Sequence, residues 1–153
     1  MAFSHKEIKK YLVLIILAGC FFIGDRFLKI LALNLNSEKV LIKDWLEFYL
    51  VKNSNGAFSL NYGFDIVWLA IIIIVIALIW LRHALQKKDF LRSLALIILV
   101  LGALSNIYDR LIYGAVIDYL VLVNLSIFNL ADCLIVMAAG LLLISERDAK
   151  QKN

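Results

Sequence analysis

The stretch IVWLAIIIIVIALIWL, residues 66–81, contains no charged side chain and no polar one other than its two indoles. With a few flanking residues it reaches the roughly 17–25 residues that an α-helix needs to cross a bilayer. Comparable apolar blocks lie at 11–24, continuing through 27–33, at 94–104 and at 133–144. None of them alternates at strand period, which argues against barrel strands. The sequence therefore predicts a membrane protein with four helices.

The composition agrees with this class. Of 153 residues, 63% are hydrophobic, against roughly 45–50% in soluble domains. We expect an all-α integral membrane protein with a single domain over residues 1–153. Its four transmembrane helices are predicted at about 10–33, 65–83, 91–110 and 129–146.

Two segments between the helices have a different character. Residues 36–62 contain β-prone runs at 39–42, 46–52 and 57–60, interrupted by Asn and Gly. These features predict a small β-cradle outside the bilayer. For residues 111–128 we expect a connecting loop or an interfacial helix on the same side.

The distribution of positive charge predicts the orientation. The net charge is +4, and ten of the sixteen Lys and Arg residues precede the first helix, fill the turn between the second and third, or follow the fourth. Positive residues gather on the cytoplasmic side of membrane proteins. Both termini are therefore predicted to be cytoplasmic, and the charge does not call for a nucleic-acid partner. The ten residues are Lys6, Lys9, Lys10, Arg82, Lys87, Lys88, Arg92, Arg147, Lys150 and Lys152.

Carboxylates are expected to form a layer near the opposite face. Counted from the basic cluster at the cytoplasmic end of each helix, Asp25 and Asp132 lie about 22 Å up and Asp109 about 25 Å up. Asp118, on the connection between the last two helices, can reach the same level. Charged groups in membrane helices are costly and usually mark function. The alternative is structural: local ion pairs at Asp25-Arg26 and Asp109-Arg110, and a helix cap from Asn129 or Asp132.

The chemistry of this layer is limited by its neighbours. Both histidines, His5 and His83, belong to the cytoplasmic side, and the two cysteines lack metal-ligand spacing. No metal or other cofactor is expected, and Cys20 and Cys133 are predicted to be small buried apolar residues. Two carboxylates held close share a proton, so that one can deprotonate water while the other donates to a carbonyl oxygen. Such a pair predicts aspartic peptidase chemistry, and the residues alone leave open which aspartate joins Asp132.

Five motifs resemble the lipoprotein signal peptidases, also called signal peptidase II. They are DRFLK at 25–29, NSNGAF at 53–58, NIYDR at 106–110, VIDY at 116–119 and FNLAD at 128–132. The resemblance implies a bacterial inner-membrane aspartic endopeptidase with its active site near the periplasmic face. We expect a monomer in contact with membrane lipids. It implies prolipoprotein substrates modified with diacylglycerol, cut just before the lipidated cysteine.

The resemblance also implies roles for individual residues. Asp118 and Asp132 would be the catalytic pair. Seven others would support the site or bind substrate: Asp25, Lys29, Asn53, Asn106, Asp109, Arg110 and Asn129. Two positions depart from the family pattern, since Asn55 and Ser105 stand where glycine is usual. The loop from Asp118 to Phe128 also looks short for the family.

Two alternatives concern other classes of protein. The stretch LAGC at 17–20 is similar to the cleavage site of a lipoprotein precursor, but the apolar run continues past Cys20. We therefore interpret Ala18, Gly19 and Cys20 as a close helix-packing patch. A small transporter or proton relay could also carry membrane carboxylates, although it would spread them through the bilayer. A structural or assembly subunit would need no such layer.

Overall fold

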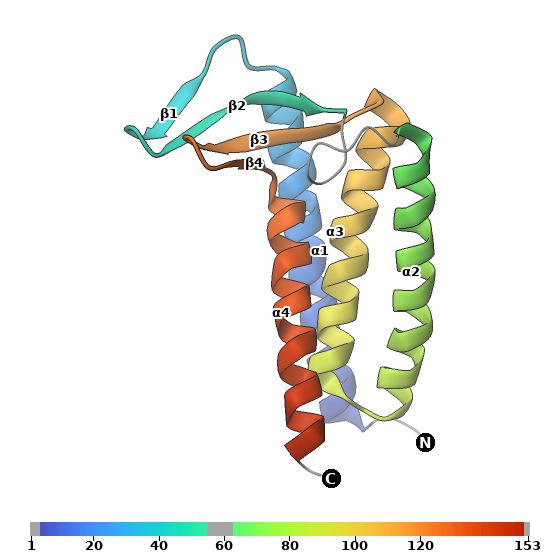
Figure 1. The fold of residues 1–153 in the computed structure, drawn as a ribbon. Helices are drawn as coiled ribbons and strands as arrows, with labels where there is room; N and C mark the ends of the chain where they lie inside the picture. The colour runs from blue at the N-terminus through green and yellow to red at the C-terminus, as the bar shows by residue number, and fades with distance from the viewer. Residues whose placement is uncertain (1–3, 55–62, 152–153) are drawn as a thin grey trace.

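Four helices stand side by side, and a small sheet lies across one end of them (Figure 1). The computed structural model describes residues 4–54 and 63–151. The helices are α1 (His5–Leu33), α2 (Gly63–Gln86), α3 (Phe90–Tyr113) and α4 (Leu130–Gln151). The first turn of α1, the last turn of α4 and the turn between α2 and α3 lie at the end opposite the sheet (Figure 1).

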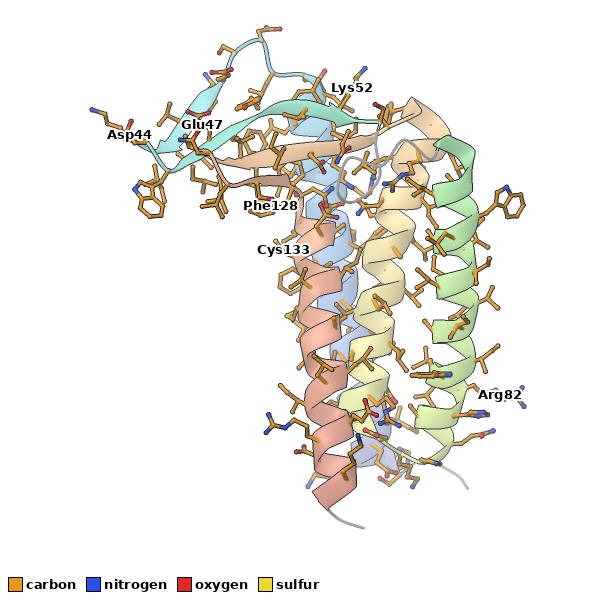
Figure 2. All side chains as sticks on the ribbon, in the orientation of Figure 1. Asp44, Glu47, Lys52, Arg82, Phe128 and Cys133 are labelled. Carbon is orange, nitrogen blue, oxygen red and sulfur yellow. The ribbon has the colours of Figure 1, made fainter. Side chains whose placement is uncertain are left out.

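Within the described ranges, three helical stretches are long and apolar enough to cross a membrane: His5–Leu33, Ile66–Gln86 and Phe90–Tyr113. Side chains along the middle of the helices are mostly carbon, whereas nitrogen and oxygen atoms gather toward the two ends, Arg82 among them (Figure 2). The protein is thus mostly helical with membrane-capable helices, as the apolar blocks predict.

The ends of the helices follow from local capping. α1 begins at His5 rather than near residue 10 because Ser4 and Glu7 form a capping box, each bonding the other's backbone N–H. α3 begins after Asp89, whose carboxylate accepts from the Arg92 N–H, and ends at Gly114 with φ of 70°. Glycine adopts that left-handed conformation without steric cost. The turn at Gly114 leads the chain directly into the sheet.

The sheet has four antiparallel strands in the order β1-β2-β3-β4. β1 (Lys39–Ile42) and β2 (Leu46–Asn53) lie where the first two β-prone runs predict them. The third predicted run, 57–60, lies outside the described residues, as does Asn55. β3 (Val116–Leu122) and β4 (Ser126–Phe128) complete the sheet.

The prediction of a loop or helix between the last two helices is wrong over 116–128. The segment VIDYLVL is rich in β-branched and aromatic residues, which favour strands. Its first four residues are all buried, so the alternation that identifies a half-buried strand is absent. β3 pairs with β2, and this places Asp118 opposite Val51.

Packing between α3 and α4 depends on Gly102. A Cβ atom at this position would lie 2.9 Å from the Ala131 carbonyl oxygen and 2.9 Å from the Ile135 side chain. The absence of a side chain lets the two helices approach closely. Gly102 thereby sets the position of the first turn of α4.

The two cysteines do not pack inside the bundle. Cys20 and Cys133 are both exposed, so the prediction that they are buried is wrong. Of the predicted packing patch only Ala18 is buried, against Ile98 and Ala138. A helix that faces lipid is apolar on its outer side too, so an apolar residue there gives no signal of burial.

Candidate active site

All nine predicted site residues come together beneath the sheet. Asp25 and Lys29 come from α1, Asn53 from the end of β2, and Asp118 from β3. Asn106, Asp109 and Arg110 lie in the last turns of α3, and Asn129 and Asp132 at the start of α4. Six of them are buried: Asp25, Lys29, Asn106, Asp109, Asp118 and Asn129. A continuous set of hydrogen bonds and ion pairs joins them.

Asn129 and Asp132 cap helix α4 reciprocally. The Asp132 backbone N–H donates to Asn129 Oδ1 at 2.9 Å, and the Asn129 N–H donates to Asp132 Oδ2 at 3.2 Å. This is the geometry of a capping box with Asp in the third helical position. The capping interpretation of FNLAD is therefore correct, but it occupies only one oxygen of Asp132. The other, Oδ1, accepts from Asn106 Nδ2 at 2.8 Å.

Asp118 is held by two side-chain amides. Asn129 Nδ2 donates to its Oδ1 at 2.6 Å, and Asn53 Nδ2 donates to its Oδ2 at 3.1 Å. Burial raises the pKa of Asp118 to about 6, and the charge of Asp132 acts in the same direction. The bonds from Asn53 and Asn129 oppose this rise because they stabilise the carboxylate.

Two asparagines link Asp118 to Asp132. Asn129 Nδ2, which bonds Asp118, also lies 3.2 Å from Asn106 Oδ1, and Asn106 in turn donates to Asp132. An asparagine carries both a donor and an acceptor, so it can join one carboxylate to the next polar group. The positions of Asp118 and Asp132 are thereby coupled.

The other two aspartates are paired with cations. Lys29 Nζ lies 3.0 Å from Asp25 Oδ2 and 2.7 Å from Asp109 Oδ2, and Arg26 Nη1 lies 2.5 Å from Asp109 Oδ1. The local pair considered for Asp25 and Arg26 is therefore not formed. Asp25 pairs with Lys29 one turn further along α1, whereas Arg26 and Lys29 both pair with Asp109 and so join α1 to α3. These four charges sum to zero, as a buried cluster requires.

Lys29 also connects this ionic cluster to the aspartate pair. Its ammonium donates to Asn106 Oδ1 at 3.0 Å, and Asn106 holds Asp132. Arg110 Nη1 donates to the Asn106 carbonyl at 3.4 Å, and its guanidinium interacts electrostatically with Asp132, Asp118 and Asp109.

Tyr119 is a site residue that the sequence interpretation missed. Its hydroxyl donates to Asp25 Oδ1 at 3.0 Å and accepts from the Leu130 N–H at 3.0 Å. Burial raises the pKa of Tyr119, so the phenol stays protonated. Successive strand residues point to opposite faces. The VIDY motif could therefore have suggested that Asp118 and Tyr119 serve two different groups.

Comparison with known proteins identifies the family. The model of the family described as Signal peptidase (SPase) II matches residues 15–146. The chain belongs to the signal peptidase II family. This confirms the resemblance carried by the five motifs.

Bacterial relatives of the same family extend over most of the chain. A lipoprotein signal peptidase of Desulfitobacterium hafniense is 35% identical over 125 residues, which are 78% of this chain and 83% of the relative. One from Dichelobacter nodosus is 32% identical over 147 residues, 90% of this chain and 95% of the relative. One from Streptomyces griseus is 30% identical over 92% of this chain and 74% of the relative.

Two solved structures share the fold. One bacterial membrane enzyme superposes with a TM-score of 0.76 at 24% identity, covering 92% of both chains. Another gives a TM-score of 0.69 at 25% identity, covering 87% of this chain and 91% of the other. The arrangement of helices and sheet in this family member is therefore that of known membrane enzymes.

One departure from the family pattern has a visible structural consequence. Ser105 stands where the family usually has glycine, and its hydroxyl donates to Asp25 Oδ2 at 2.5 Å. Ser105 Oγ in turn accepts from Lys29 Nζ and from Arg26 Nη1, each at 3.2 Å. The ionic cluster of this signal peptidase II member thus has a central hydroxyl. Within the described part of the chain, no group of three or more His, Cys, Asp or Glu side chains could hold a metal ion.

Proposed function

We propose that Asp118 and Asp132 form the catalytic pair of this peptidase, which removes signal peptides from prolipoproteins. The observation that supports this pair is that the four aspartates of the layer have two different types of partner. Asp25 and Asp109 are each within 3.0 Å of Lys29. Asp118 and Asp132 instead accept hydrogen bonds from neutral amides. A carboxylate that is not held in a close ion pair takes up and releases a proton more readily.

The two members of the pair have different surroundings. Asp132 lies in the first turn of α4, where the helix dipole favours a negative charge. Asp118 is only 2% exposed, and this burial favours its protonated form. We therefore assign Asp132 as the general base and Asp118 as the general acid.

Hydrolysis then proceeds in two proton-balanced steps. Asp132 takes a proton from water as the water oxygen attacks the carbonyl carbon, and Asp118 gives its proton to the carbonyl oxygen. When the C–N bond breaks, Asp132 gives its proton to the leaving nitrogen and Asp118 recovers the proton from the hydroxyl. Seven other residues hold the pair in place without entering either step: Asp25, Lys29, Asn53, Asn106, Asp109, Arg110 and Asn129.

The proposed membrane arrangement has four spans. α4 adds a fourth to the three membrane-capable helices, because it is apolar between Cys133 and Ile144. Nine of the ten clustered basic residues, all but Lys152, lie in the described ranges, at the end of the bundle where α1 begins and α4 ends (Figure 1). That end is proposed to be cytoplasmic. The sheet and the aspartate pair then lie near the periplasmic face, and the bilayer surrounds a monomer.

The proposed substrate follows from this position. A site at the outer end of the bundle can receive a signal peptide from within the bilayer and a lipidated cysteine from the surface. We propose cleavage just before the cysteine that carries diacylglycerol.

The test uses purified protein in detergent and a prelipoprotein whose cysteine carries diacylglycerol. Asp118→Asn and Asp132→Asn are compared with wild type and with Asp44→Asn, a matched change at an exposed aspartate outside the site. We expect wild type and Asp44→Asn to release the signal peptide and both site variants to lose at least about 10³-fold in kcat. Folding of each variant is checked by its melting temperature.

Two results would overturn the assignment. Normal cleavage by either folded site variant would remove that aspartate from the pair, and Asp109 would be tested next. Equal cleavage of an unlipidated precursor would refute recognition of the lipidated cysteine.

A further inference from the structure

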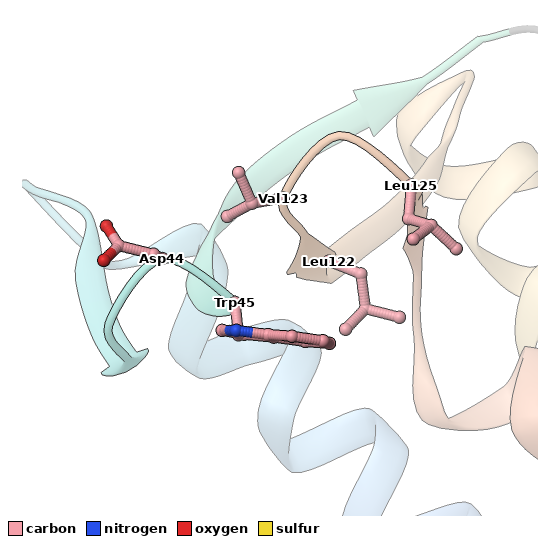
Figure 3. Close-up of a pocket in the computed structure, with 5 residues that line it drawn as sticks. All are labelled: Asp44, Trp45, Leu122, Val123 and Leu125. Carbon is pink, nitrogen blue, oxygen red and sulfur yellow. The ribbon is translucent and has the colours of Figure 1, made fainter.

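The end of the sheet farthest from α3 carries large exposed apolar side chains. Trp45, in the β1–β2 turn, is 69% exposed, and Leu125, in the β3–β4 turn, is 83% exposed. The two turns are joined, since the Val123 N–H donates to the Trp45 carbonyl at 3.0 Å. Together with Leu122 they line a pocket of about 460 Å³ (Figure 3). We call Trp45, Leu122 and Leu125 the sheet tip.

The side chains of the sheet tip share one side of the turns. Figure 3 shows Trp45, Leu122 and Leu125 pointing toward the side where the helices lie, whereas Val123 points to the opposite side. Figure 1 shows the sheet extending sideways beyond α1 and α4. The apolar side of the sheet tip therefore faces the space that surrounds the helices.

That space borders a continuous apolar surface. On the outer half of α1, Phe27 is 64% exposed and Ile30 is 53% exposed. β4 ends at Phe128 and α4 begins at Leu130, so the sheet joins α4 with one residue between them. In the proposed membrane arrangement the outer side of α1 contacts lipid, and the sheet tip extends this exposed apolar surface beyond α1 (Figure 1).

We propose that the sheet tip inserts into the membrane leaflet on the active-site side and that phospholipid chains occupy its pocket. Tryptophan is enriched at membrane interfaces because its ring is apolar while its N–H can reach water. Lys43 and Asp44, exposed in the same turn as Trp45, remain at the level of the headgroups. Bilayer lipid is the occupant that the continuity with α1 and α4 favours, because another protein would have to displace lipid from the helices as well. The proposal rests on the proposed membrane arrangement and not on the catalytic pair.

The first test measures the environment of Trp45 directly. A Trp68→Phe/Trp80→Phe variant keeps Trp45 as the sole tryptophan of the chain. It is reconstituted into vesicles of phosphatidylethanolamine and phosphatidylglycerol that contain lipids brominated at shallow or deep acyl positions. We expect shallow bromines to quench Trp45 at least twofold more than deep ones, and iodide in the water to quench it weakly.

Two results would overturn the proposal. Strong quenching by iodide with none by brominated lipid would place Trp45 in water. Protection from both quenchers that disappears on dilution of the protein in lipid would show that a second copy covers the sheet tip. If the double variant does not fold, the difference between wild type and Trp45→Phe gives the same signal.

A matched pair of substitutions tests the direction of insertion. In the single-tryptophan background, Leu125→Asp is expected to lower quenching by brominated lipid at least twofold, whereas Val123→Asp leaves it unchanged. Equal effects of both would contradict the geometry. Both variants should keep their peptidase activity in detergent. Loss of lipid contact is thereby distinguished from failure of the catalytic assignment, which is measured by the Asp118 and Asp132 variants.

Discussion

Lys29 offers the most demanding test of the ionic cluster. Its side chain is fully buried, and its ammonium lies 3.0 Å from Asp25 and 2.7 Å from Asp109. Replacement by Met keeps the length and apolar stem of the side chain but removes the charge. The cluster of Arg26, Lys29, Asp25 and Asp109 then carries a net charge of −1 in a buried site.

The expected loss follows from this imbalance. Breaking a buried ion pair by removing one partner costs about 3–5 kcal/mol, because the other charge stays buried. For a protein of this size, 1 kcal/mol corresponds to roughly 2–4 °C in melting temperature. We therefore expect Lys29→Met to lower the melting temperature by about 10 °C. Peptidase activity should also fall, because Lys29 Nζ holds Asn106, which holds Asp132.

A double-mutant cycle separates charge balance from side-chain packing. Lys29→Met/Asp25→Asn restores a neutral cluster, in which Arg26 still pairs with Asp109. The amide oxygen at position 25 can still accept from Tyr119 and from the Ala131 N–H. We expect the double variant to be more stable than Lys29→Met by at least about 2 kcal/mol. The free energy of unfolding is measured in mixtures of detergent and SDS for wild type, the two single variants and the double variant.

Two outcomes would refute this reasoning. If Lys29→Met is within 1 kcal/mol of wild type, the ammonium does not balance two buried carboxylates. If the double variant loses the sum of the two single losses, the charges act independently. Lys88→Met is the control, because its ion pair with Glu7 lies at the surface and should contribute little to the free energy of unfolding.

Three further predictions follow from single contacts. The Gly102→Val variant places atoms against the Ala131 carbonyl. It should lower the free energy of unfolding by about 1–3 kcal/mol and also lower kcat. An unchanged melting temperature would contradict close helix packing. Ser105→Ala removes a buried hydroxyl and should lower the free energy of unfolding by about 2 kcal/mol with little change in kcat. A variant that is stable but inactive would instead indicate a catalytic role for the hydroxyl. Asn53→Ala removes a bond that lowers the pKa of Asp118. Asp118 then keeps its proton to higher pH, so the alkaline limb of kcat/KM should move upward; an unmoved or downward limb would refute Asp118 as the acid.

The sequence was sufficient to find the carboxylate layer because depth along a helix depends only on residue number. The helical rise fixes how far Asp25 or Asp109 lies from the helix end. It does not fix which residue of another helix each one faces. The pairing of Arg26 with Asp109 depends on the rotation of α1 against α3, and this is set by packing. Hence the sequence suggested a local pair at Asp25-Arg26, whereas in the structure Arg26 pairs with Asp109 of α3 and Asp25 pairs with Lys29.

Two other errors share a physical cause, which is that burial and lipid exposure produce similar residue patterns. Cys20 lies on an apolar helix whose outer side needs no polar residue, so it gave no sign of facing outward. The first four residues of β3 are all buried, and α1 and α3 both pack against this strand. A strand of that kind lacks the period of two by which strands are identified.

The charge balance of the site connects its stability to its chemistry. The cluster and the aspartate pair together contain four carboxylates, whereas the nearby cations are Arg26, Lys29 and Arg110. With every group ionised, the site carries one excess negative charge at the end of an apolar bundle, where desolvation penalises it. One proton makes the site neutral. Asp25 and Asp109 lie in close ion pairs with Lys29 and Arg26, and among the described residues Asp118 and Asp132 form no such pair. We therefore propose that Asp118 and Asp132 share this proton. That protonation state is the one that attack by water on a peptide bond needs, with acid assistance at the carbonyl oxygen.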